Sequence, residues 1–213
     1  MNTRNLLIAL IAALAALLVW LAFFWEPVGP RPVARVQSHA PLQLATAPTG
    51  GDFALQGGQG PVRLADYRGK AVLLYFGYTY CPDVCPTSLS LLAQALSGFS
   101  ADELARIQPI FISVDPERDT PARLAEYGPF FHPSIIGVTG SSEEVARVAA
   151  QYGASYARQP ANADGQYAVD HSSATYVIDP RGILVDTLPH GTPPARIIEA
   201  VRPLLAAPAT PPR

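Results

Sequence analysis

Apolar residues are distributed along this chain in two distinct ways. Residues 6–25 form one uninterrupted apolar run without a formal charge, which is long enough to cross a bilayer as a helix. Farther along, short apolar runs of strand length alternate with segments in which apolar residues recur at helical spacing. This alternation predicts an α/β fold in which a central mixed β-sheet is flanked by helices.

The N-terminal apolar run predicts an uncleaved membrane anchor over residues 1–25. A cleaved signal peptide has a shorter apolar core and a small-residue cleavage site, whereas this run ends in Phe23-Phe-Trp-Glu-Pro27. Residues 26–48 are rich in proline and show no periodicity, which is typical of a flexible tether. We expect one folded domain over residues 49–205 and a disordered tail over 206–213.

The order of elements inside the expected domain is specific. The pattern predicts a glycine-rich β-hairpin, strands that alternate with helices, a second hairpin and a last helix. The expected segments are a hairpin over 50–64, a strand over 71–76, a helix from Pro86 to about 97, a short helix after Ser100, a strand over 109–114, a helix from 121 to about 127, a strand over 135–139, a helix after Ser141, a hairpin over 174–186 and a helix after Thr192. With two thiols placed after an early strand, this order predicts a thioredoxin-like fold with an N-terminal β-hairpin.

The only two cysteines, Cys81 and Cys85, lie where the apolar strand over 71–76 gives way to a helix. Pro86 suits the first helical position, which needs no N–H. A helix N-terminus lowers the pKa of a nearby thiol, and a spacing of four allows both sulfurs to share one side of the first turn. A disulfide across so small a loop would contribute only about 2 kcal/mol. We therefore interpret the pair as functional, either in thiol redox chemistry or in binding a soft metal.

Two sulfurs leave a metal site short of ligands, and a histidine is the natural third donor. His171 lies in Val169-Asp-His-Ser-Ser173, just before an apolar strand. In a thioredoxin-like sheet this strand begins near the cysteine corner, so Cys81, Cys85 and His171 form a candidate metal site. Asp170 is a candidate acceptor for the histidine ring. Three other histidines are expected to be incidental: His39, His132 and His190.

Charge narrows the range of partners. The chain has 15 Lys and Arg against 17 Asp and Glu, with a formal net charge of −2. It carries no basic run, which argues against nucleic acid as a partner. The acidic residues Asp83 and Asp115 are expected to be solvated surface groups near the cysteines. Because no Arg- and Ser-rich transit segment precedes the anchor, we expect a single-pass protein of the bacterial inner membrane with its domain in the periplasm.

Three segments together resemble the Sco/SenC family. They are residues 75–86 (Tyr-Phe-Gly-Tyr-Thr-Tyr-Cys-Pro-Asp-Val-Cys-Pro), residues 113–121 (Ser-Val-Asp-Pro-Glu-Arg-Asp-Thr-Pro) and residues 169–173. The resemblance covers roughly residues 50–205 together with the anchor. One departure is Tyr80, because the family often has histidine directly before the first cysteine.

The resemblance implies a membrane-tethered copper chaperone of thioredoxin-like fold. Members of the family help to assemble the copper A (CuA) centre of cytochrome c oxidase subunit II. By resemblance, Cys81, Cys85 and His171 are the ligands of Cu(I) or Cu(II), and subunit II is the client. An upstream periplasmic copper donor or thiol reductant is a further expected partner, and the anchor contacts the lipid bilayer.

A different class of function stays open from the sequence. Cys81 and Cys85 could be the redox-active catalytic pair of a thiol–disulfide oxidoreductase that reduces the CuA-site cysteines of the same client. A zinc site completed by water is also compatible with the spacing. A peroxidase of the peroxiredoxin type needs a threonine three positions before its reactive cysteine, and Thr79 lies only two before Cys81. Whether the chain is an enzyme is therefore undecided at this stage.

Overall fold

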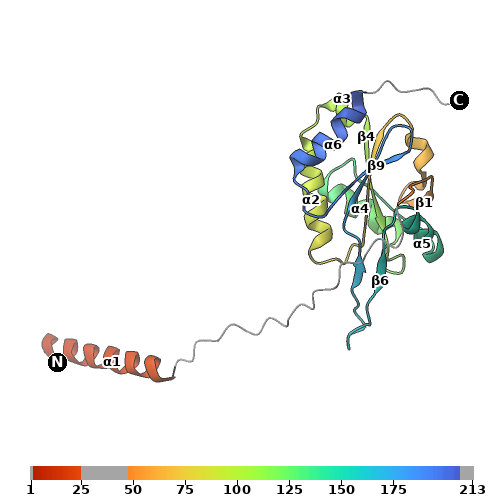
Figure 1. The fold of residues 1–213 in the computed structure, drawn as a ribbon. Helices are drawn as coiled ribbons and strands as arrows, with labels where there is room; N and C mark the ends of the chain where they lie inside the picture. The colour runs from red at the N-terminus through yellow and green to blue at the C-terminus, as the bar shows by residue number, and fades with distance from the viewer. Residues whose placement is uncertain (1, 25–47, 207–213) are drawn as a thin grey trace. The chain divides into compact units, whose positions relative to one another are not determined.

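The computed structural model describes residues 2–24 and 48–206 of the chain (Figure 1). The predicted tether, with His39, and the predicted tail lie outside the described residues except for Pro48 and Ala206 at their borders.

The N-terminal part is a single helix, α1 (Thr3–Phe24). It has 22 residues, which at about 1.5 Å per residue is comparable with the roughly 30 Å of a bilayer's hydrocarbon core. By length and composition, Thr3–Leu21 is able to cross a membrane. Trp25, the last residue of the predicted anchor, lies outside the described residues.

The domain is built on a mixed sheet of seven strands in the order β2-β1-β5-β4-β3-β8-β9. The central strands β3, β4 and β5 are parallel, and the flanking pairs are antiparallel. The strands are β1 (Ala54–Gly57), β2 (Gly60–Arg63), β3 (Ala71–Gly77), β4 (Ile107–Ser113), β5 (Ile136–Thr139), β8 (Thr175–Ile178) and β9 (Leu184–Leu188). The predicted N-terminal hairpin and the predicted central mixed sheet are both confirmed.

Helices cover the two faces of this sheet. Side chains that alternate along β3 show which helix covers which face. Tyr75 stacks on Phe111, which contacts Tyr127 of the fourth helix, whereas Phe76 points to the other face and meets Tyr152 at the end of the fifth. Helices α2 and α6 pack side by side (Figure 1). The helices are η1 (Leu64–Tyr67), α2 (Val84–Ser97), α3 (Ala101–Leu104), α4 (Pro121–Phe131), α5 (Ser142–Gln151) and α6 (Pro194–Ala206).

Two helix boundaries differ from the prediction. Helix α2 begins at Val84, so Pro86 is its third residue and not its first; proline is tolerated there because N–H groups of the first turn have no intrahelical acceptor. Helix α4 continues through Pro129 to Phe131 instead of ending near 127. Packing of the Phe131 ring on Tyr127 offsets the hydrogen bond that Pro129 cannot donate.

A small second sheet was not predicted. Strands β6 (Tyr156–Arg158) and β7 (Val169–His171) pair antiparallel, with Tyr156 opposite His171. Each strand has three residues, which is too short for a period of two to be recognised. His171 is therefore the last residue of a strand and not part of a loop entering β8.

Candidate metal centre

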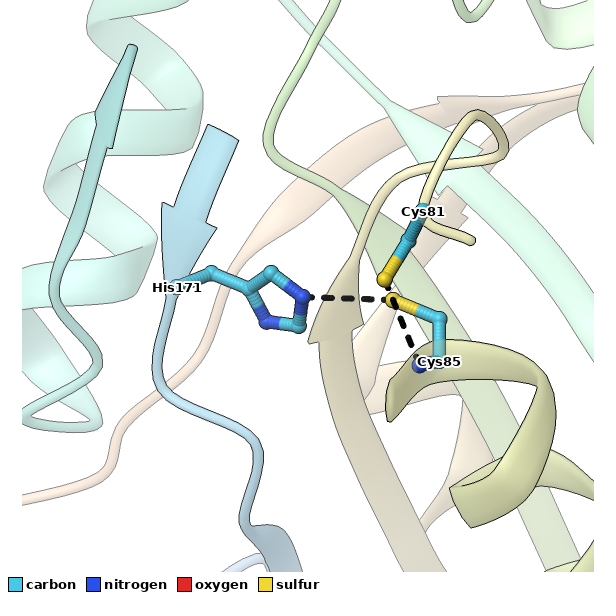
Figure 2. A group of neighbouring side chains, drawn as sticks. All are labelled: Cys81, Cys85 and His171. Carbon is cyan, nitrogen blue, oxygen red and sulfur yellow. Dashed lines mark hydrogen bonds between the residues drawn. The ribbon is translucent and has the colours of Figure 1, made fainter. Parts of the chain in front are cut away.

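The two cysteines approach one another across the start of α2, as Figure 2 shows. Cys85 lies in the first turn of the helix and is fully buried, whereas Cys81 lies in the turn that precedes it. The Cys85 backbone N–H points to the Cys81 sulfur at 3.4 Å. The Cys81 sulfur thus accepts from a helix N–H, as a capping side chain ordinarily does. The sulfurs meet without both belonging to the first helical turn, which corrects the expected geometry.

His171 reaches the cysteines from the end of β7. Its Nε2 lies 3.2 Å from Cys85 Sγ, and its Nδ1 lies 3.0 Å from the Ser172 carbonyl oxygen. A carbonyl can only accept a hydrogen bond, so Nδ1 carries a proton, and Nε2 is the ring nitrogen that faces the sulfurs. The ring is therefore oriented by a main-chain carbonyl, and the Asp170 carboxylate accepts a hydrogen bond from Gln159.

The three donor atoms form one compact group. The Cys81 and Cys85 sulfurs and a ring nitrogen of His171 all lie within 4.8 Å of one another. Bonds from a metal ion to thiolate and imidazole are about 2.0–2.3 Å long, so one ion placed between these atoms reaches all three. The structure thus brings together the three residues that the sequence singled out, although Cys85 and His171 are 86 positions apart in the sequence.

The two thiols have opposite protonation tendencies. The pKa of Cys81 is lowered to about 4, chiefly by a hydrogen bond from Cys85, with further contributions from His171 and from backbone N–H groups. The same contact with Cys81, together with burial, raises the pKa of Cys85. The metal-free reduced site consequently holds one thiolate and one thiol at neutral pH, and an ion that binds both sulfurs must displace one proton.

Two tyrosine rings enclose the histidine. Tyr75 and Tyr78 present their rings edge-on to His171, with ring centres 6.3 and 5.8 Å from the imidazole. Both tyrosines are buried, and burial raises the pKa of each phenol, so both remain neutral. These contacts fix the plane of the imidazole and keep the inner side of the site dry. This role could not be predicted from the sequence, because buried aromatic residues are common in any core.

Gly77 is a second residue whose role was missed. A Cβ atom at this position would lie 2.6 Å from Cys85 Sγ and 3.0 Å from the Phe111 ring. The end of β3 therefore has to be glycine for the Cys85 sulfur to occupy its place. The available signal was the glycine that interrupts the apolar run directly before the cysteine segment.

The acidic neighbours divide into one exposed and one buried group. Asp83 is exposed, and its carboxylate accepts from the Thr87 hydroxyl at 3.3 Å. Asp115, expected to be solvated, is buried and accepts from Arg118 and from the Tyr167 hydroxyl. The expectation was wrong because the loop after β4 folds inward, where a buried carboxylate requires such partners.

The remaining described histidines lie in other contacts. His132 Nδ1 is 2.8 Å from the Ser134 hydroxyl within its own turn. His190 Nδ1 is 2.8 Å from the Ser88 hydroxyl on α2. Neither belongs to the group formed by Cys81, Cys85 and His171.

Known proteins share both the sequence and the fold. The family model SCO1/SenC matches residues 42–206. The mitochondrial SCO2 homologue of Bos taurus is 41% identical over 211 residues, covering 97% of this chain and 77% of its own. The human SCO2 homologue is 42% identical over 159 residues, covering 74% of this chain, which spans only 60% of that protein's length.

Two similar solved structures contain copper. The crystal structure of Arabidopsis thaliana ScoI with copper bound has a TM-score of 0.68 and 37% identity, covering 74% of this chain and 98% of its own. The structure of Bradyrhizobium japonicum ScoI with copper bound has a TM-score of 0.68 and 36% identity, covering 74% and 99%. These likenesses confirm the predicted fold class. Together with the match of the family model over most of the domain, they show that the chain belongs to the SCO1/SenC family.

Proposed function

We propose that this chain binds one copper ion through Cys81 Sγ, Cys85 Sγ and His171 Nε2 and delivers it to the CuA centre of cytochrome c oxidase subunit II during assembly. The observation that carries the proposal is the convergence of two sulfurs and a ring nitrogen within 4.8 Å. Two soft thiolates and an imidazole suit three-coordinate Cu(I). Copper in the Arabidopsis and Bradyrhizobium relatives supports the choice of metal.

The arrangement favours a carrier over a permanent metal site. Cys85 is inaccessible, but Cys81 retains 9% of its surface and His171 is only half-buried. A thiol of the client can therefore reach the ion from the side of Cys81 and His171. Delivery then proceeds by ligand exchange, in which client thiolates replace Cys81 and Cys85 one at a time. Cys85 gives up its proton when copper is captured and regains one when copper leaves.

A second candidate function is supported by the lowered pKa of Cys81. As a thiol–disulfide oxidoreductase, the Cys81 thiolate attacks a disulfide of the client and forms a mixed disulfide, releasing one client thiolate. Cys85 then loses its proton and displaces the second client sulfur. Cys81 and Cys85 end as a disulfide, the client ends as a dithiol, and two electrons have moved. An upstream thiol reductant would restore the pair.

We further propose that α1 anchors the chain in a bacterial inner membrane and that the domain over residues 49–205 lies in the periplasm. Support comes from the length and apolar composition of α1 and from similarity to a ScoI of the bacterium Bradyrhizobium japonicum. An anchored carrier meets a membrane-bound client in two dimensions, and a tether over residues 26–48 would let the site reach it. An upstream copper donor in the same compartment would load the site.

Copper competition with His171→Ala tests the main proposal. The full-length chain in detergent, with both thiols reduced, is titrated with Cu(I) against a chromogenic Cu(I) chelator. Wild type should bind one copper per chain. His171→Ala should bind more than about tenfold more weakly, because even indirect partners of a metal ligand are worth 10–100-fold in affinity. The reduction potential of the Cys81–Cys85 pair should change far less.

The control is His190→Ala, which removes an exposed histidine outside the site and should leave copper binding unchanged. Equal copper affinity in wild type and His171→Ala would remove His171 from the site. Weak copper binding by wild type that does not depend on His171 would move the function to thiol–disulfide exchange.

A further inference from the structure

A fully buried carboxylate lies beside the cysteine turn and accepts hydrogen bonds from Thr79 and Ser113. Asp119 has no exposed surface. Its Oδ2 accepts the Thr79 backbone N–H at 2.8 Å and the Ser113 hydroxyl at 2.6 Å, and its Oδ1 accepts the Thr79 hydroxyl at 2.6 Å. A buried carboxylate is costly unless such donors satisfy it, so its place here calls for an explanation in terms of what it holds.

The network around Asp119 is closed. The Thr79 hydroxyl, which donates to Asp119, accepts from Arg123 Nε at 2.6 Å. The Ser113 hydroxyl, which also donates to Asp119, accepts from the Asp115 backbone N–H at 3.1 Å. The Arg123 guanidinium lies 3.9 Å from the carboxylate itself. Each hydroxyl therefore has one acceptor and one donor, which fixes its orientation and makes the network rigid.

This network positions Cys81, the one residue of the proposed metal site that lies outside the helices and strands. Cys85 lies in α2 and His171 in β7, but Cys81 lies in the turn that follows the end of β3 at Gly77. The turn is closed locally by the Cys81 N–H, which donates to the Tyr78 carbonyl at 3.2 Å. Thr79 lies inside this turn, and Asp119 holds it by both its main chain and its side chain from 40 positions away in the sequence.

We infer that Asp119 is a positioning residue for copper: through Thr79 it holds the turn that carries Cys81, and so sets where the Cys81 sulfur stands relative to Cys85 and His171. The inference rests on the proposed copper function and deepens it. Because Cys81 is the most accessible of the two sulfurs, its position decides both the fit of the ion and the ease of exchange with a client thiol.

A purely structural role for Asp119 makes a different prediction. The residue directly precedes Thr120, whose hydroxyl caps α4 by accepting the Arg123 N–H at 3.2 Å. If Asp119 served only to start this helix or to join β3 to β4, weakening its bonds would lower stability and leave the sulfurs where they are. Variants of Thr79 can distinguish the two roles, because Thr79 belongs to the cysteine turn and not to α4.

The test compares Thr79→Val, Thr79→Ser and Ser113→Ala in the full-length chain in detergent. Valine has the shape of threonine without the hydroxyl, so Thr79→Val loses the hydroxyl's bonds to Asp119 Oδ1 and Arg123 Nε and keeps the backbone N–H bond to Asp119 Oδ2, while Thr79→Ser retains all three. Ser113→Ala removes a hydrogen bond donated to Oδ2 of the same carboxylate by the last residue of β4, which lies outside the cysteine turn. Each variant is measured for Cu(I) affinity against a chelator, for the reduction potential of the copper-free Cys81–Cys85 pair, and for thermal unfolding.

Thr79→Val should bind Cu(I) about 10-fold or more weakly, in the range found when a partner of a metal ligand is lost, and its dithiol potential should shift. Thr79→Ser should restore wild-type values. Ser113→Ala should unfold at lower temperature with copper affinity and potential within about twofold of wild type. Wild-type affinity and potential in Thr79→Val, or an equal loss in Ser113→Ala, would overturn the inference. If wild type itself binds no copper, the proposed function fails, and the potentials of the copper-free variants still decide whether Asp119 positions Cys81.

Discussion

The cysteine half and the histidine half of the site are held by structures of unlike strength. Cys85 sits at the start of α2, which packs on α6 and α4, and the turn of Cys81 is tied to β4 through Asp119. His171 ends β7, whose recorded strand partner is the three-residue β6 in a separate small sheet. The sulfurs are thus part of the core of the domain, and the imidazole is attached at its edge.

The difference suggests that the two halves of the site contribute differently to holding copper and to releasing it. A carrier has to hold copper firmly and also release it, and one rigid frame serves these needs poorly. Local stability is lowest where few buried contacts and short hydrogen-bonded pairings hold a segment, which describes β6 and β7 better than α2. We therefore expect changes in the cysteine half to disturb copper binding more than changes around His171 that leave the imidazole itself in place.

The largest effect should come from Gly77→Ala. The new methyl group would stand 2.6 Å from Cys85 Sγ, and because β3 and α2 are both fixed, the sulfur has to move. Overpacking in a core costs about 1–3 kcal/mol, and a displaced ligand should lower Cu(I) affinity about 10–100-fold. Chelator competition on the full-length chain in detergent measures this loss.

Gly98→Ala is the matched control, because its Cβ would lie 2.7 Å from Ile198 Cδ1 at the far end of the same helix. The distance of approach is similar, although the Ile198 tip can move aside more easily, and none of the three metal-binding residues is near. If both alanines weakened copper binding equally, the loss would be a general effect of strain in α2 and the cysteine half would have no special sensitivity.

A smaller effect is expected in the histidine half from Tyr78→Leu. Its ring lies edge-on to His171 with centres 5.8 Å apart, and such ring pairs are worth about 0.5–1.5 kcal/mol. Copper affinity should fall about two- to tenfold, by the conversion of roughly 1.4 kcal/mol per factor of ten. Tyr78→Phe keeps the ring and should stay near wild type in the same competition. A loss larger than that of Gly77→Ala would reverse the proposed order of the two halves.

The sequence predicted the cysteine half better than the histidine half, for a physical reason. Cys81 and Cys85 are close in the chain, and a strand, a glycine and a helix start are local signals that place them together. His171 was found by the usual position of its strand in a thioredoxin-like sheet, and the short strand that carries it was missed. Its orienting acceptor, the Ser172 carbonyl, has no side-chain signal at all.

Long-range polar contacts were the other limit of the sequence. The motif over 113–121 contains both Asp115 and Asp119, but only Asp115 was considered as a neighbour of the site, and burial is a property of the folded loop and not of the residue type. Asp115 was expected at the surface for that reason, and the contact of Asp119 with Thr79 spans 40 positions. The main sheet, by contrast, was predicted well, because β3 is a continuous apolar run and β4 and β8 contain shorter ones, each followed by a turn signal.

The smallest change is expected when pH is varied, and it sharpens the comparison within the cysteine half. The pKa of Cys81 is lowered to about 4 and that of Cys85 is raised, so between about pH 5 and 8 Cys81 is already a thiolate and Cys85 is not. An ordinary cysteine has a pKa of about 8.5, and its alkylation rate falls roughly tenfold for each pH unit below that value. In the copper-free reduced chain, iodoacetamide should therefore modify Cys81 at a rate nearly independent of pH over this range and leave Cys85 unmodified, as peptide mass spectrometry will show. A Cys81 alkylation rate that rises tenfold per pH unit, or alkylation that begins at Cys85, would contradict this prediction. Cys81 would then not be the sulfur that first meets a client thiol.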